Sequence, residues 1–218
     1  MKVLVLCDDK WHPAEVVERG LAFLEEEGSC SLDYVKDAKD ILTPGMLKEY
    51  PVILCAKGNE LTGANPVPWF EAGVTEVGPE DLRAYVEEGG GFLSLHAGNS
   101  FRSEECSAYT EFVGNSFVKH PPRCDVRVRV VGEHPVTEGV QDFTVRDEHY
   151  ELEHLAEDRT ELLLAESDAG GTQTAGYVRQ MGKGRICVLT PGHILSVFQE
   201  ENYKRLIRNA VLWCAGQR

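Results

Sequence analysis

A short apolar run followed at once by a segment of helical period constrains the fold more than any other feature of this chain. The run Val-Leu-Val-Leu-Cys (3–7) stops at two aspartates, as a strand buried on both faces would. Residues 13–28 then carry apolar side chains at helical spacing, with Pro13 at the start and Gly28 at the end. A strand followed by a helix is half of a crossover unit, so we expect parallel neighbouring strands.

The same alternation continues to residue 95. The pattern predicts strands at 31–37, 51–56 and 91–95 and helices at 44–50 and 79–90. Alternating strands and helices indicate an α/β fold with a doubly wound, mostly parallel sheet flanked by helices.

The second half of the chain is richer in strands. Strands are predicted at 125–131, 160–167, 175–180 and 185–190, and an amphipathic helix closes the chain at 201–216. The turn Gly-Lys-Gly (182–184) joins the last two strands as a hairpin. This turn lacks the Ser/Thr and the spacing of a phosphate loop, so no nucleotide cofactor is predicted. No repeat divides the chain, and we predict a single domain over 1–218.

Composition excludes several partners. The 218 residues include 36 Asp+Glu against 22 Lys+Arg, a net charge of -14, which would repel nucleic acid and anionic membrane surfaces. No stretch is apolar enough for a membrane helix, and the N-terminus lacks a signal-peptide pattern. The seven cysteines are odd in number, scattered and without a CxxC pair, so we expect reduced thiols, no thiolate zinc site and a cytoplasmic location. The sequence leaves open whether the chain forms a homo-oligomer.

Ligands of open α/β sheets bind beyond the carboxyl ends of the strands. That rule selects Asp9 and His12 after the first strand, His96 and Asn99 after the fourth, and His193 after the last. One histidine in such a place is more often structural than functional, but two in glycine-flanked turns, His96 and His193, favour a site.

Three further features have a structural interpretation beside the functional one. His12 precedes a proline, which favours a helix-entry residue. The run Asp147-Glu148-His149-Tyr150 is either a solvated strand edge or a set of polar groups at the site. For Trp69 and Phe70 we expect core packing ahead of a lid or an interface.

The turn Ser-Leu-His-Ala-Gly (94–98) has the small-x-nucleophile-x-Gly form with histidine at its centre. His96 cannot replace a hydroxyl or thiol nucleophile, and Cys106 lies ten residues further on, in the following predicted helix. Covalent acyl transfer therefore loses its main support. Imidazoles and carboxylates can instead move protons, bind a polyol or hold a divalent metal, although no HxH or HExxH spacing requires a metal.

Four motifs occur in one order along nearly the whole chain: GGGFLSLHAG, EHPVTEGVQDFTVRDEHYE, GKGRICVLTPGH and RNAVLWCAG. With them the sequence resembles the ThuA-like (trehalose utilisation) family, whose fold is similar to that of class I glutamine amidotransferases. The resemblance implies that flavodoxin-like scaffold without the glutaminase reaction, because His96 occupies the nucleophile slot. His193 falls near the slot of the catalytic histidine.

The resemblance also implies a function. The turn histidine, His120-Pro121, the residues Asp147, Glu148 and Tyr150, and Gly192-His193 match the family's pattern. What is known of the family points to the catabolism of trehalose and other disaccharides, and of 3-keto-glycosides made by partner dehydrogenases. The expected partner is thus a small-molecule carbohydrate.

From these residues we predict proton abstraction next to a sugar carbonyl, as in a keto-sugar isomerase or lyase. His96 or His193 is the expected base and Glu148 the complementary acid/base. The predicted substrate-binding residues are Asp9, Asn99, Asp147 and Tyr150. A divalent metal such as zinc is expected on His96, His120, Glu148 and His193. Two alternatives are a non-catalytic sugar-binding or assembly module and a metal-dependent hydrolase.

Overall fold

The computed structural model describes residues 1–36, 41–59, 69–70 and 75–218. Within them, nine strands form one sheet in the order β2-β1-β3-β4-β11-β10-β9-β6-β7. The first five strands in that order are parallel to one another. Their bounds are β1 (Lys2–Cys7), β2 (Ser31–Lys36), β3 (Val52–Cys55), β4 (Gly91–Leu95) and β11 (Gly184–Leu189).

The remaining four strands continue the same sheet in antiparallel pairs. They are β10 (Gly171–Met181), β9 (Thr160–Ser167), β6 (Cys124–Val130) and β7 (Phe143–Asp147). Two further strands, β5 (Asn115–Lys119) and β8 (Glu151–His154), form a separate small sheet. The α/β class is confirmed, as is the hairpin that joins β10 to β11, but the sheet is evenly mixed rather than mostly parallel.

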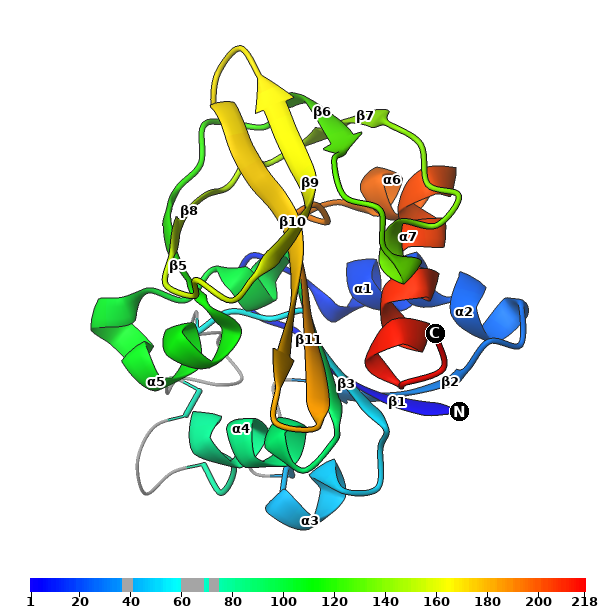
Figure 1. Ribbon diagram of the computed structural model, residues 1–218, viewed down its shortest axis with the longest axis vertical. Coiled ribbons are helices and arrows are strands. Elements are labelled where there is room, and N and C mark those ends of the chain that lie inside the picture. The colour runs from blue at the N-terminus through cyan, green and yellow to red at the C-terminus, as the bar shows by residue number, and fades with distance from the viewer. Residues whose placement is uncertain (37–40, 60–68, 71–74) are drawn as a thin grey trace.

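Helices cover both faces of the parallel half (Figure 1). One face carries α1 (Ala14–Leu21), α2 (Phe23–Glu26), α6 (Leu195–Phe198) and α7 (Glu201–Cys214), so the predicted helix over 13–28 is divided in two. The other carries α3 (Pro44–Leu47), α4 (Pro79–Glu87) and α5 (Ser103–Val113). Of two 3-10 turns, η1 (His96–Asn99) lies between β4 and α5, and η2 (Pro135–Thr137) lies between β6 and β7.

Strand β1, which lies between β2 and β3, shows why its sequence is continuously apolar. Val3 and Val5 belong to the core shared with α1 and α7, whereas Leu4 and Leu6 belong to the core shared with α3 and α4. Successive side chains of a strand point to opposite faces, so a strand with helices on both sides has no solvent-facing position. Among the described residues, no helix is long and apolar enough to cross a membrane.

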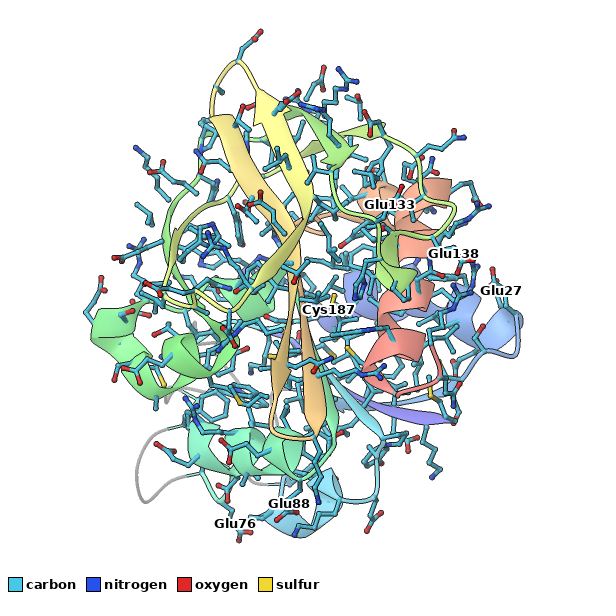
Figure 2. The ribbon with its side chains drawn as sticks, in the orientation of Figure 1. Glu27, Glu76, Glu88, Glu133, Glu138 and Cys187 are labelled. Carbon is cyan, nitrogen blue, oxygen red and sulfur yellow. The ribbon has the colours of Figure 1, made fainter. Side chains whose placement is uncertain are left out.

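Most of the cysteines are buried. Cys187 lies on β11 in the middle of the molecule, whereas the labelled glutamates lie at the surface (Figure 2). Burial raises the pKa of Cys7 and of Cys214 to about 12. Among the seven cysteines, only Cys106 and Cys124 are half-buried.

We therefore expect a thiol reagent to label at most Cys106 and Cys124 rapidly in the native protein, because a buried, protonated thiol is a poor nucleophile. Mass spectrometry of labelled peptides measures this. The same reagent in denaturant is the control and should label all seven cysteines. Rapid native labelling of Cys7 or Cys187 would contradict the packing of β1 and β11.

Candidate functional site

The turn between β4 and η1 presents a histidine at the edge of the sheet. His96 has a φ of 41°, a positive value that residues other than glycine seldom adopt. A Cβ on Gly98 would lie 2.4 Å from the carbonyl oxygen of Cys55, so the turn packs directly against β3. The motif at 94–98 is therefore a sharp, strained turn that fixes the direction of the His96 ring.

Three polar side chains from distant parts of the sequence meet at this turn. His96 Nε2 lies 3.4 Å from His193 Nδ1 and 3.4 Å from Glu148 Oε2. The third side of this triangle, from His193 Nδ1 to Glu148 Oε2, is also 3.4 Å. The Tyr150 hydroxyl lies 3.2 Å from His96 Nε2. The structure thus brings together His96, His193 and Glu148, the three residues predicted to be catalytic.

His12 joins this group, although its position before Pro13 favoured a helix-entry role. Its ring meets those of His96 and His193 edge to face, with centroids 5.0 and 5.1 Å away. One potential ligand atom from each of His12, His96, Glu148 and His193 lies within 4.8 Å of the others. The helix-entry interpretation was incomplete. The available signal was the position of His12 beyond the carboxyl end of the first parallel strand.

His120 lies outside that group of four, although the sequence predicts it as a metal ligand. Its Nε2 is 3.6 Å from Glu148 Oε1, whereas His96 and His193 approach Oε2. The Nδ1 atom of His120 is 2.8 Å from the carbonyl oxygen of Pro121. His120 follows β5, which pairs with β8 outside the main sheet, and this places its ring on the outer side of the carboxylate.

Two of the predicted substrate-binding residues are buried carboxylates that accept backbone hydrogen bonds. Asp9 accepts from the backbone N–H of Gly58 at 2.7 Å and contacts His12 Nδ1 at 2.8 Å. Asp147 accepts from the backbone N–H groups of Gly192 at 2.7 Å and His193 at 3.1 Å. Neither lines the cavity described below. Asp9 and Asp147 therefore hold backbone groups beside the site, and their contact with substrate stays a prediction.

Asn99 is likewise buried and used within the fold. Its Oδ1 accepts a hydrogen bond from Ser94 Oγ at 2.7 Å, and its Nδ2 donates to the carbonyl oxygen of Leu189 at 3.1 Å. These bonds tie η1 to the ends of β4 and β11. Substrate contact by Asn99 is thus a prediction that its buried placement does not support.

A cavity of about 930 Å³ opens over the cluster. Glu148, His193, His120 and Tyr150 are among the residues that line it, so Tyr150 is the one predicted substrate-binding residue that borders the cavity. Aromatic side chains form much of the remaining wall: Trp11, Trp69, Phe70 and Phe117. Trp69 is 4% exposed, so the expected core packing is confirmed while the ring also borders the cavity.

Burial and neighbouring charges both change the pKa values of the residues in this cluster. Burial opposes the ionisation of Glu148, but the hydrogen bond from His96 and the surrounding imidazoles outweigh it and lower the pKa to about 2. Burial and the charge of His96 lower the pKa of His193 to about 4. Burial also opposes the charged form of His96, yet its contacts with Glu148 and Asp147 raise its pKa. The cluster is therefore an ionised carboxylate surrounded by imidazoles.

One family model and several solved structures match this chain. The family model for ThuA, described as trehalose utilisation, matches residues 2–214. No protein with a curated description matches the sequence.

Solved structures share the fold. A ThuA-like protein from Bacteroides uniformis is 21% identical with a TM-score of 0.74, and the match covers 98% of this chain and 91% of that one. A ThuA-like protein from Parabacteroides merdae is 18% identical with a TM-score of 0.75, covering 99% and 90%. A cytoplasmic protein from Salmonella typhimurium is 15% identical with a TM-score of 0.66, covering 98% and 99%.

The close approach at Gly98 is testable by adding one methyl group. We expect Gly98→Ala to lower the free energy of unfolding by about 1–3 kcal/mol, because the new Cβ meets the Cys55 carbonyl. Urea unfolding measures this. Gly45→Ala in α3 is the matched control, since the nearest atom to its new Cβ is 3.8 Å away. Equal stability of the two variants would show that the turn yields without cost.

Proposed function

The chain belongs to the ThuA trehalose-utilisation family, and on that premise we propose that it is an enzyme that removes a proton next to the carbonyl of a 3-keto-glycoside. One observation carries the proposal: Glu148, His120, His193 and Tyr150 line the same cavity as the aromatic residues Trp11, Trp69, Phe70 and Phe117. Aromatic walls with a few converging polar groups are typical of a small-molecule site. Aromatic faces suit the C–H faces of a sugar ring.

The scaffold supports the proposal that the glutaminase reaction is absent. The parallel strands follow the order β2-β1-β3-β4-β11, the order of flavodoxin-like sheets. The strained turn after β4 has the form of a nucleophile elbow, but it presents the imidazole of His96. Cys106 lines the cavity from α5, and burial raises the pKa of its thiol, so it is a poor substitute nucleophile.

Access decides which histidine we assign as the base. The His96 side chain is 3% exposed, so of the two bases predicted, only His193 faces the cavity. His120 faces it as well, and its Nδ1 lies against the Pro121 carbonyl. A carbonyl oxygen only accepts, so Nδ1 carries the hydrogen and Nε2 keeps the lone pair. We assign His120 as the base and His193 to the side of the substrate carbonyl.

These groups account for the proton and the electron pair that move in the proposed step. His120 Nε2 takes the proton from the carbon next to the ketone, and the C–H electron pair forms an enolate with its charge on the former carbonyl oxygen. The Tyr150 hydroxyl donates a hydrogen bond to that oxygen. Glu148 Oε1, 3.6 Å from His120 Nε2, stabilises the imidazolium that forms.

Proton abstraction can be measured whatever the final product is. With a 3-keto-glucoside in D2O, we expect the wild type to exchange the hydrogen next to the ketone for deuterium, as followed by NMR. Glu148→Gln and His120→Ala should each slow the exchange by about 100-fold or more, since a positioned base contributes about that factor. Glu133→Gln, an exposed glutamate that does not line the cavity, is the matched control.

Other results of this experiment would change the proposal. Binding of the keto-sugar without exchange by the wild type would favour the sugar-binding module. Loss of exchange in His193→Ala with normal exchange in His120→Ala would move the base to His193.

Trp11 offers a separate test of sugar binding. Its ring is 56% exposed at the rim of the cavity, where it can stack on a sugar ring without touching the reacting atoms. We expect Trp11→Ala to raise KM for the keto-glucoside about 10-fold with kcat changed less than about 2-fold, the pattern of lost uniform binding. Steady-state kinetics measures both constants. Trp11→Phe retains an aromatic face and should stay near the wild type; a fall in kcat alone would remove Trp11 from the binding surface.

A further inference from the structure

We infer that His12, His96, Glu148 and His193 hold one divalent cation of the zinc class at the base of the cavity. Its role, to polarise the carbonyl of the sugar, rests on the proposed function. Its binding rests on geometry alone. The inference replaces His120 with His12 in the ligand set expected from the sequence.

Ligand spacing is the first argument. The distances among His96 Nε2, His193 Nδ1 and Glu148 Oε2 are all 3.4 Å. Bonds of about 2.0–2.2 Å in a tetrahedral zinc site place neighbouring ligand atoms roughly 3.3–3.6 Å apart. The three atoms therefore form one face of such a tetrahedron, with His12 supplying the fourth corner within 4.8 Å. Three imidazoles and one carboxylate match the ligands that zinc takes in proteins.

A buried nitrogen without a partner is the second, independent argument. His12 Nε2 is buried, and within the described part of the chain it has no hydrogen-bond partner. The His12 side chain is 9% exposed, so solvent does not readily supply one. An ion pair between His96 and Glu148 explains one edge of the cluster but leaves this nitrogen unsatisfied. A cation bound by His12 Nε2 satisfies it.

The opposite nitrogens of two rings are held as in metal sites. His12 Nδ1 lies 2.8 Å from Asp9 Oδ1, and His96 Nδ1 lies 2.7 Å from the carbonyl oxygen of Thr190. Both partners are acceptors, so Nδ1 carries a hydrogen, and Nε2 offers its lone pair to the cluster once a cation replaces the proton that His96 shares with Glu148. Carboxylate or carbonyl partners of this kind are the usual outer contacts of histidine ligands.

The same arrangement separates the cation from the proposed base. Glu148 presents Oε2 to the cluster and Oε1 to His120. Glu148 and His193 also line the cavity, so a substrate oxygen can approach the cation from that side. His120 is thereby left to accept the proton.

Titration calorimetry of the chelator-treated full-length protein with Zn²⁺ tests the inference. We expect one ion per chain with a dissociation constant of about 1 μM or tighter. His12→Ala should weaken binding by about 100-fold, and Asp9→Asn, which alters an outer contact, by about 10- to 100-fold. His120→Ala is the matched control and should bind within about 3-fold of the wild type. Circular dichroism verifies folding; should His12→Ala not fold, Glu148→Gln serves in its place.

Each remaining outcome overturns a stated part. Wild-type binding weaker than about 1 mM, or unchanged binding in folded His12→Ala, removes the cation site. If His120→Ala weakens Zn²⁺ binding as much as is expected for His12→Ala, His120 is a ligand, as the sequence predicts. Zn²⁺ binding without deuterium exchange would overturn the proposed function while the cation site stands. Exchange at the wild-type rate by the chelator-treated protein would overturn the cation's role in the reaction while its binding stands.

Discussion

The carboxylate of Asp147 joins the two halves of the sheet at the point where the site forms. It ends β7, in the antiparallel half, and accepts hydrogen bonds from the backbone of Gly192 and His193, beyond the end of β11 in the parallel half. Without that link, nothing in strand pairing would bring Glu148 to the histidines, because β7 and β11 are separated by three strands in the sheet order. Because Glu148 directly follows Asp147 in the sequence, the hydrogen bonds of Asp147 also fix the position of Glu148.

Much of the parallel half could be predicted because its physics is local. A strand covered on both faces must be apolar throughout, and the helices that cover it have capping prolines and glycines, so both are visible in the sequence. The antiparallel extension was less predictable. Whether β6, β7, β9 and β10 form a second sheet or continue the first depends on edge pairing between distant segments, and no single segment encodes that.

The residues of the site were likewise predictable where the signal was local, and less so where it depended on distant segments. His96 and His193 stand in glycine-flanked turns after buried strands, a local pattern. His12 precedes a helix-starting proline, and that local role concealed the direction of its ring. Asp9, Asn99 and Asp147 were correctly located at the sheet edge but face backbone groups rather than the cavity. The sequence shows that a carboxylate follows a strand; which atoms it contacts depends on loops that converge only in three dimensions.

The backbone strain at His96 bears on whether this site is retained for function. A positive φ at a residue with a Cβ costs free energy, and glycine would relieve it without changing the turn. The conformation holds the ring between the Thr190 carbonyl on one side and Glu148, His193 and Tyr150 on the other. Hydrogen bonds and ion pairs of this kind require one direction of the ring, whereas hydrophobic packing alone would not. The strain is therefore best explained by the need to present one imidazole nitrogen to the cluster, whether for a proton or for a cation.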